Sequence, residues 1–335
     1  MASIFLGIDT SCDDTCCGVV KEGRKVLSSV VSSQEEIHSK FGGVVPEYAS
    51  RAHVERIGWV VKTALDKSGL SWEEVEGIGV TRGPGLPGSL LVGWEFAKGL
   101  SLSAGIPLIP INHLEAHLFA PFLDFEGEVD FPLLGMVVSG GHTLLAYSPT
   151  PYDFYLLGQT RDDACGEALD KVARLLGLPY PGGPHLEKLA EKGNASRIDF
   201  PKKILPQSYD FSFSGLKTHA VRIFQSGKYK VEDLAASFQE AVMDILVDKL
   251  DYAVETLKVG TVVVGGGVVA NKRLRKKLDE FSRERKIPLL YPKVSYSLDN
   301  GAMIAGLAYF KYLKGIEFSW REDIDPSFNL ERWER

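Results

Sequence analysis

The sequence predicts an α/β protein of two similar domains, because the same order of elements occurs twice along the chain. In each half, apolar runs of strand length flank a short polar turn, a third run follows, and helices then alternate with strands. The length of 335 residues also corresponds to about two domains. We therefore expect two mixed sheets with helices on their faces, and a ligand cleft between the domains.

The individual elements follow from hydrophobic periodicity and from Gly or Asn residues at their ends. In the first half, strands are expected at 3–9, 16–20, 25–33, 77–82 and 106–112, and helices at 50–69, 89–105 and 113–120. In the second half, strands are expected at 132–138, 144–148, 154–160, 261–267 and 287–293, and helices at 166–177, 232–257, 270–285 and 300–313. A less regular insertion is expected at about 178–235.

Composition narrows the functional classes. The net charge of −6 argues against a protein coated in nucleic acid, although it leaves room for a local basic patch. The N-terminus has no basic region before its apolar run, and no run of about eighteen apolar residues occurs, so we expect no signal peptide, no membrane span and a cytoplasmic protein. The four cysteines, Cys12, Cys16, Cys17 and Cys165, form no C-x-x-C pair and are expected to be buried thiols in a reducing compartment.

The segment INHLEAHLFA (residues 111–120) is a candidate metal site. His113 and His117 lie four residues apart, on one face of a predicted helix that Asn112 can cap. A helix N-terminus favours neutral imidazole, the form that binds metals. Asp299, just before the last helix, could be a third ligand or simply a helix cap. Two histidines and one carboxylate would suit iron(II) or zinc, whereas Glu115 is misplaced for an H-E-x-x-H protease.

Three glycine loops are candidates for ligand binding. RGPGLPG (82–88) contains a G-x-G-x-x-G pattern but lacks the acidic residue that a dinucleotide site needs. VSGGHT (138–143) could present bare backbone N–H groups to an anion, or could be a plain tight turn. VGGGVVAN (264–271) could let a flat ligand lie against the backbone near Asn271. Asp170 could accept a hydroxyl or simply face solvent, and the basic run NKRLRKK (271–277) could contact nucleic acid or lie on a solvated helix face.

The segments GIDTSCDDT, NHLEAH, VVSGGHT, GEALDKVARLLGLPYPGGP, FSFSGLKT, GGGVVAN and LDNGAMIAG occur in the order typical of one family. The chain resembles, over nearly its whole length, the TsaD family (formerly Gcp), the tRNA threonylcarbamoyladenosine transferases, and its TSCDDT start looks like the bacterial branch. The resemblance implies an actin-like (ASKHA) fold with two ribonuclease-H-like domains around a central cleft. The first domain would be 1–131 plus 299–335, and the second 132–298 with a helical insertion.

The resemblance also implies site residues. The metal, Fe²⁺ or Zn²⁺ and one per chain, would be held by His113, His117 and Asp299. The substrate contacts would be Val137, Val138, Ser139, Gly140, Gly141, Asp170, Gly183, Glu187 and Asn271, with Glu187 standing where many members have Asp. Asp9 stands where Glu is commoner, and the general base is unassigned, with Asp9 and Asp13 as candidates.

The implied reaction is the transfer of a threonylcarbamoyl group from threonylcarbamoyl-adenylate to N⁶ of the adenosine 3′ of the anticodon, in tRNAs that read ANN codons. The implied partners are tRNA, a smaller paralogue, TsaB, and an ATPase, TsaE, with no membrane. Three alternatives stay open on sequence alone: an endopeptidase, which is the older label of the family, an ATP-driven kinase of the same fold, and a scaffold without catalysis.

Overall fold

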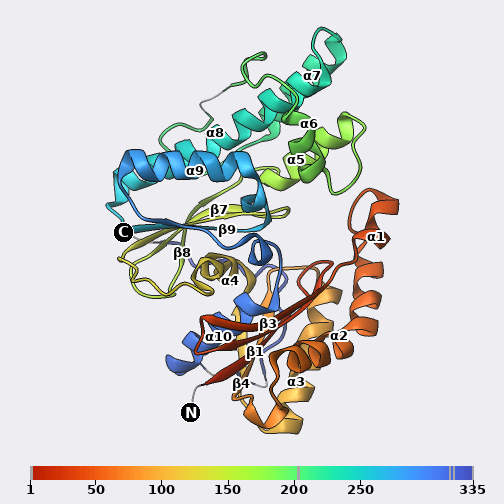
Figure 1. Cartoon of the computed structure of the whole chain (residues 1–335), viewed down its shortest axis with the longest axis vertical. Coiled ribbons are helices and arrows are strands. Elements are labelled where there is room, and N and C mark those ends of the chain that lie inside the picture. Colours follow the sequence, from red (N-terminus) through yellow and green to blue (C-terminus); the bar gives the residue numbers. More distant parts are fainter. Residues whose placement is uncertain (1–2, 202–203, 317, 320, 334–335) are drawn as a thin grey trace. The chain divides into compact units, whose positions relative to one another are not determined.

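The computed structural model describes residues 3–201, 204–316, 318–319 and 321–333, and the other residues of the predicted domains and insertion lie outside this part. The chain divides into two compact units (Figure 1). One unit is Met1–Glu128 with Pro292–Leu330, and the other is Val129–Tyr291 with Glu331–Arg335. Within the described residues, no helix is both long and apolar enough to cross a membrane.

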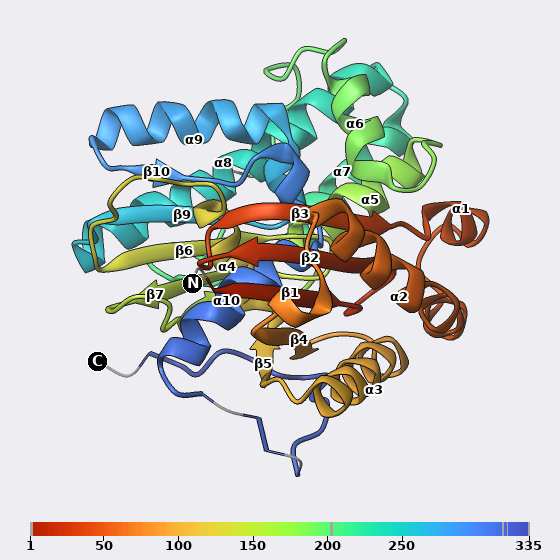
Figure 2. The same ribbon diagram turned by 60° about the horizontal axis from the view of Figure 1, so that its bottom comes forward.

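The first unit contains a five-stranded sheet of order β3-β2-β1-β4-β5, in which β1 pairs antiparallel with β2 and parallel with β4. Its strands are β1 (Ile4–Asp9), β2 (Thr15–Lys21), β3 (Lys25–Ser32), β4 (Gly77–Gly83) and β5 (Leu108–Asn112). Its helices are α1 (Glu35–His38), η1 (Ser39–Phe41), α2 (Pro46–Ser68), η2 (Trp72–Glu74), α3 (Pro87–Ala104), α4 (His113–Phe119), η3 (Ala120–Phe122), η5 (Val294–Tyr296) and α10 (Gly301–Leu313). Figure 2 shows β1 between β2 and β4 in this sheet.

The side chains of β1 point alternately to the two faces of the sheet, and this determines on which face Asp9 lies. Ile4, Leu6 and Ile8 belong to an apolar cluster with α2 and α3, on one face of the sheet. On the other face α10 packs so closely that a Cβ on Gly7 would lie 2.2 Å from the backbone nitrogen of Ala305. Because successive side chains of a strand point to opposite faces, Asp9 shares the face of Gly7 and α10.

The second unit repeats the topology, with a five-stranded sheet of order β10-β9-β6-β7-β8. Its strands are β6 (Leu133–Val138), β7 (Thr143–Ser148), β8 (Tyr155–Gln159), β9 (Thr261–Gly265) and β10 (Leu289–Leu290). Its helices are α5 (Cys165–Leu175), α6 (Gly182–Ala190), α7 (Ser214–Ser226), α8 (Val231–Leu257), η4 (Gly267–Ala270) and α9 (Lys272–Arg285). In both sheets three antiparallel strands are followed by two strands that pair in parallel.

The repeated order confirms the predicted α/β fold with two mixed sheets, and several details differ from the prediction. The helix predicted at 50–69 begins four residues earlier, at Pro46, whose fixed φ suits the first helical position. The expected strand at 287–293 is only the two residues of β10. The irregular insertion contains two helices, α6 and α7. Cys16, Cys17 and Cys165 are buried free thiols, as predicted, and Cys12 is half-buried.

The last described residues lie in a different unit from the one expected. The resemblance implied that all of 299–335 belongs to the first domain. In the structure the backbone nitrogen of Leu156 donates to Glu331 O (2.6 Å), and the Trp333 ring lies 4.6 Å from the ring of Tyr147 and 5.3 Å from that of Tyr155. These contacts place residues 331–333 in the second unit, and no periodicity in so short a segment indicates such a return.

Candidate metal centre and ligand loops

The candidate metal centre begins where β5 becomes α4. The side chain of Asn112 accepts hydrogen bonds from the backbone nitrogens of Leu114 (2.8 Å) and Glu115 (3.3 Å), so it caps the helix as the sequence predicts. The amide of Asn112 also donates to Phe328 O at 2.8 Å. Both histidines follow Asn112 within two helical turns. Because Asn112 is itself held by Phe328, it fixes the start of the helix that carries them.

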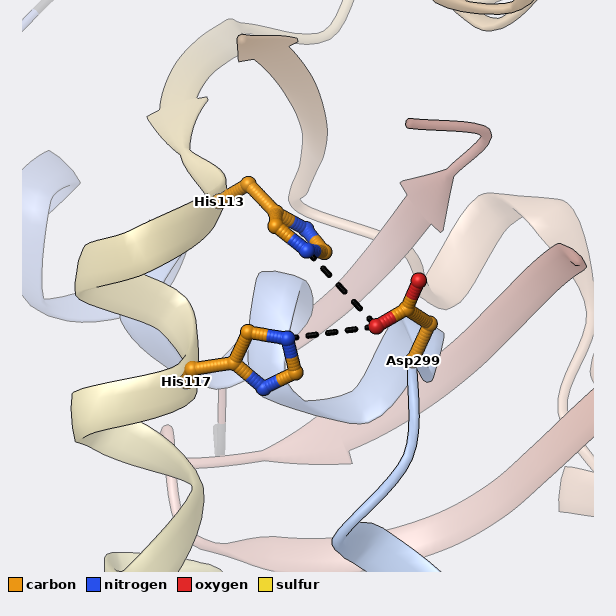
Figure 3. Close-up of side chains that lie close together, drawn as sticks. All are labelled: His113, His117 and Asp299. Carbon is orange, nitrogen blue, oxygen red and sulfur yellow. Dashed lines mark ion pairs between the residues drawn. The ribbon is translucent and has the colours of Figure 1, made fainter. Parts of the chain in front are cut away.

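His113, His117 and Asp299 lie together in the first unit (Figure 3). Oδ1 of Asp299 lies 3.6 Å from Nε2 of His113 and 3.1 Å from Nε2 of His117. The imidazole rings meet edge to face, with centroids 4.5 Å apart. Asp299 is not the N-cap of α10, because Asn300 has that place and accepts from the backbone nitrogen of Met303 at 2.9 Å.

The chemistry and spacing of these groups fit a divalent metal ion. The three ligand atoms lie within 4.8 Å of one another. Ligands bound at 2.0–2.2 Å in a tetrahedral arrangement are separated by about 3.4 Å, and the two measured N–O separations lie on either side of this value. His117 is 1% exposed, and apart from the 3.1 Å approach of Asp299 Oδ1 to Nε2 its ring nitrogens have no polar partner within the described part of the chain. Buried polar atoms normally have partners, so these nitrogens suit a metal that binds through one of them.

Asp9, at the end of β1, stands behind His113. Its Oδ2 lies 3.2 Å from Nδ1 of His113, and its Oδ1 accepts from the backbone nitrogen of Ser11 (3.0 Å) and from the hydroxyl of Thr81 (2.9 Å). The side chain is fully buried. A carboxylate in this position fixes the ring and leaves Nε2 for a metal. The geometry therefore differs from the sequence suggestion of Asp9 as a general base, because this carboxylate faces a histidine.

The charge state of His113 also differs from the sequence expectation. Burial alone would lower the pKa of His113, but the carboxylates of Asp9 and Asp299 outweigh it and raise that pKa to about 9. The helix N-terminus was expected to keep the imidazole of His113 neutral. The two carboxylates beside the ring have the larger effect on its pKa. In the metal-free chain the site holds a proton that a metal must displace.

The loop between β1 and β2 brings further carboxyl groups near this site. Burial is the largest cause that raises the pKa of Asp14, and the carboxylates of Asp299 and Asp13 raise it further, to about 7. The sequence suggested Asp13 as a base and missed Asp14, since the burial of the Asp14 carboxyl depends on the fold. A carboxyl that titrates near neutrality has the property that a general base needs.

Glu115 lies on the same helix as the histidines and has another partner. Its carboxylate pairs with the amine of Lys311 on α10, and the two side chains are 14% and 16% exposed. A metalloprotease needs a free carboxylate directed at a metal-bound water. This ion pair ties α4 to α10, so the structure gives Glu115 a structural role and does not favour an endopeptidase.

In the second unit, the loop between β6 and β7 contains the glycines of VSGGHT. The turn is closed by hydrogen bonds from the backbone nitrogen of Ser139 to His142 O (2.8 Å) and from that of His142 to Ser139 Oγ (3.0 Å). A Cβ added to Gly140 or Gly141 would meet no atom of the chain within 4 Å, and both have ordinary φ angles. Neither packing nor backbone strain requires glycine at these two positions. A ligand that approaches the backbone would explain why they lack side chains.

The glycines of RGPGLPG differ in this respect. A Cβ on Gly83 would strike the carbonyl oxygen of Asp325, and one on Gly85 would lie 2.4 Å from the carbonyl oxygen of Ser11. Close approach of the chain to itself therefore accounts for these two glycines. The structure supports the sequence inference that this G-x-G-x-x-G match is no dinucleotide site.

Asp170, on α5, clamps the glycine turn at the start of α6. Its Oδ1 accepts from the backbone nitrogens of Gly182 (2.8 Å) and Gly183 (3.0 Å). Burial raises the pKa of Asp170, against the opposing effect of these two hydrogen bonds. The suggested solvated position is thus wrong, because the carboxylate is half-buried and holds a helix N-terminus.

Asn271 and Glu187 meet at the start of α9. The side chain of Asn271 accepts from Leu274 N (3.0 Å), and its amide donates to Oε1 of Gln239 (2.9 Å). Oε1 of Glu187 accepts from Lys272 N at 2.7 Å. Gln239 is 8% exposed and fixes the orientation of the Asn271 amide. Sequence reasoning missed it, because a Gln within a long helix gives no local signal.

Three basic residues of α9 pair with acidic residues of α8: Arg273, Lys277 and Arg285. Arg273 forms two 2.6 Å hydrogen bonds to Glu240, and Lys277 lies 2.7 Å from Glu240 and also pairs with Asp244. These contacts join two helices of one unit. Two of the five basic residues of NKRLRKK, Arg273 and Lys277, therefore serve packing between helices, whereas Lys272 and Lys276 are exposed.

A family model described as TsaD: tRNA N6-adenosine threonylcarbamoyltransferase matches residues 25–306. A protein of this name from Desulfitobacterium hafniense (strain Y51) is 48% identical over 332 residues, which cover 97% of each chain. Another from Caldicellulosiruptor bescii is 46% identical over 333 residues, which cover 98% of each chain.

Two solved structures are similar in fold. HypF from T. kodakarensis has a TM-score of 0.66 at 15% identity, over 94% of this chain and 48% of that one. The (R)-2-hydroxyglutaryl-CoA dehydratase component A of Acidaminococcus fermentans has a TM-score of 0.55 at 15% identity, over 93% and 99%. These likenesses agree with the actin-like (ASKHA) fold that the family resemblance implies, and with the two sheets of repeated order. With a model match over most of its length and relatives near half identity over almost all of it, the chain belongs to the TsaD family of tRNA N6-adenosine threonylcarbamoyltransferases.

Proposed function

We propose that this protein is a tRNA N⁶-adenosine threonylcarbamoyltransferase of the cytoplasm. The donor is threonylcarbamoyl-adenylate, and the acceptor is the adenosine 3′ of the anticodon in tRNAs that read ANN codons. The observation that carries the proposal is the group of two buried histidines, His113 and His117, and the half-buried Asp299 in a chain of this family. An acceptor base in an RNA loop can be turned out of its stack at little cost.

In the proposed reaction, the N⁶ amine of the adenosine attacks the carbamoyl carbonyl carbon of the donor. A new C–N bond forms, the bond from that carbon to the phosphate oxygen breaks, and AMP leaves with the electron pair. The amine loses one proton to a base. Asp13 and Asp14 are the candidate carboxyl groups in the first unit, whereas Asp9 is occupied by His113.

His113, His117 and Asp299 would hold one Fe²⁺ or Zn²⁺ ion. When bound, such an ion supplies a Lewis acid that polarises a carbonyl oxygen. Asp9 would accept a hydrogen bond from Nδ1 of His113, and so keep Nε2 unprotonated for the ion. The capped start of α4 keeps both rings in place.

The second unit would bind the adenylate. Val137 and Val138, at the buried end of β6, and Ser139, Gly140 and Gly141, in the loop that follows, would form the ligand-binding segment, and the loop offers backbone N–H groups that can approach a phosphate. Asp170, Gly183, Glu187 and Asn271 would supply the other contacts. The open space beside Gly140 and Gly141 supports the first assignment. The Gln239–Asn271 hydrogen bond supports the second, because a fixed amide is prepared for binding.

We expect the enzyme to work with a smaller paralogue, TsaB, and an ATPase, TsaE. Large apolar side chains are exposed on η1 and α2, which is typical of a surface that another protein covers. They are Phe41 (55% exposed), Tyr48 (48%), Val54 (64%) and Trp59 (49%). Substituting Trp59 with Ser should weaken complex formation, measured by light scattering after mixing with the paralogue.

Nucleoside analysis of reacted tRNA tests the proposal. The protein, its partners, preformed threonylcarbamoyl-adenylate and an unmodified ANN-reading tRNA should yield threonylcarbamoyladenosine without threonine or bicarbonate. Asp299→Ala should abolish the product, because it removes the only anionic member of the ligand group. Absence of product with verified donor and partners would contradict the proposal. ATP-dependent phosphorylation of a small acceptor would indicate a kinase, and protein cleavage without tRNA a protease.

A further inference from the structure

The end of α7 and the turn into α8 have an unusual surface composition. Residues 222–230 read RIFQSGKYK, and no Asp or Glu occurs between residues 211 and 231, in a chain with a net charge of −6. Arg222, Lys228 and Lys230 are exposed. None of these three side chains makes an ion pair within the part of the chain that the structure describes. The cations are therefore available to a negatively charged partner.

Two aromatic rings lie among these cations in the sequence. Phe224 and Tyr229 are each 39% exposed, on either side of Gly227, whose left-handed conformation ends α7. Large rings beside unpaired cations match what single-stranded RNA requires, because rings stack on bases and cations contact phosphates. Figure 1 shows α7 beside α8 in the helical part of the second unit.

The contrast with α9 supports RNA as the partner of this turn. The cations of α9 are more numerous, yet Arg273, Lys277 and Arg285 pair with acidic residues of α8. A cation that pairs within the protein has no free charge to offer a phosphate, whereas an unpaired one releases counterions when RNA binds. The sequence pointed to α9, and the ion pairs move the expectation to the α7–α8 turn.

We propose that the α7–α8 turn surface, made of Arg222, Phe224, Lys228, Tyr229 and Lys230, is a contact site for the tRNA substrate. The three cations bind backbone phosphates, and at least one ring stacks on an unpaired base. The inference rests on the proposed function for the identity of its partner. The test measures tRNA binding and does not require the transfer reaction. A failure of this inference can therefore be distinguished from a failure of the proposed function.

The charge part of the proposal is tested with Lys228→Ala/Lys230→Ala. Binding of fluorescent unmodified tRNA to the full chain is measured by anisotropy at several salt concentrations. Loss of two phosphate contacts should reduce the slope of log affinity against log salt by about 1.5. The matched control is Lys276→Ala/Lys286→Ala, which also removes two exposed positive charges, one within α9 and one just after it, outside the α7–α8 turn surface. The control should keep the wild-type slope.

The stacking part is tested with Tyr229→Ala and Phe224→Ala. At least one should weaken tRNA binding by about tenfold, with the salt slope unchanged, because a ring carries no charge. All variants should bind an adenylate ligand as the wild type does and melt at the same temperature. Unchanged tRNA affinity in the four substitutions would overturn the proposal. An equal loss in the α9 control, or a loss only of binding to phosphatidylserine vesicles, would also overturn it.

Discussion

At the scale of single residues, one buried carboxylate controls the orientation of a candidate metal ligand. Asp9 has no exposed surface. Its Oδ1 accepts hydrogen bonds from Ser11 and Thr81, and its Oδ2 lies 3.2 Å from Nδ1 of His113. Outer carboxylates of this kind select the tautomer and raise the basicity of the ligating nitrogen. Its position at the end of β1, on the face of α10, follows from strand alternation.

Replacing Asp9 with Asn should therefore weaken metal binding about 10- to 100-fold. The Asn side chain can keep the acceptor for Ser11 and Thr81, but its amide group cannot accept the proton of Nδ1. The measurement is a competition titration of Zn²⁺ between the protein and a chromophoric chelator. Thr81→Val is the control, because it disturbs the neighbour of Asp9 without touching His113, and an equal loss in both variants would show a general packing effect.

Gly140 tests the ligand loop in the same way. A Cβ at this position meets open space, so Gly140→Ala should leave the melting temperature nearly unchanged while it weakens adenylate binding. Gly166→Ala is the contrasting variant, because its Cβ would lie 2.7 Å from Ser139 O and should destabilise the fold. Calorimetry and thermal melting separate the two effects. Unchanged adenylate affinity in Gly140→Ala would leave VSGGHT as only a turn.

At the scale of elements, charged pairs join α8 to α9. Burial would raise the pKa of Glu240, but hydrogen bonds from Arg273 and Lys277 outweigh it and lower that pKa to about 2. Because the folded-state pKa lies below the ordinary value of 4.5, the stabilisation is complete above pH 4.5 and is lost as the pH falls toward 2.

Glu240→Gln should thus destabilise the protein by about 1.5–3 kcal/mol at pH 7, the range for hydrogen bonds to charged groups. The difference from wild type should shrink as the pH is lowered below 4.5. Urea denaturation at pH 7 and at pH 4 measures it. A difference that grows toward acid would mean that Glu240 is not stabilised in its charged form.

The strands and the long helices were predictable, because their periodicity is local. Asn112, His113 and His117 could be placed on one capped helix from spacing alone. What the sequence did not show depends on distant segments: Lys311 of α10 pairs with Glu115, and acidic residues of α8 pair with Arg273 and Lys277 of α9. None of these partners is marked by its own sequence neighbourhood, so pattern reasoning assigned the charges of α9 to solvent or RNA.

At the scale of the whole molecule, two copies of one sheet topology support different chemistry. The first unit contains the imidazole and carboxylate group, and the second contains the open glycine loop and the helix N-termini. The difference arises at strand ends and helix starts, since β1 ends in Asp9 and the corresponding β6 ends in Val138 and the VSGGHT turn. A shared fold therefore says little about function until these positions are compared.

Removal of the metal should leave this fold intact. Asn112 and Asn300 cap the helices next to the ligands, and Asp9 is held by two donors besides His113, so the site does not depend on an ion for its shape. Binding still stabilises the folded state, by about 2.7 kcal/mol at a hundredfold excess over Kd. We expect the chelated protein to keep its circular dichroism spectrum and to melt several degrees lower. Added Zn²⁺ should restore the melting temperature of wild type but not of His117→Ala, and unfolding on chelation would contradict a preformed site.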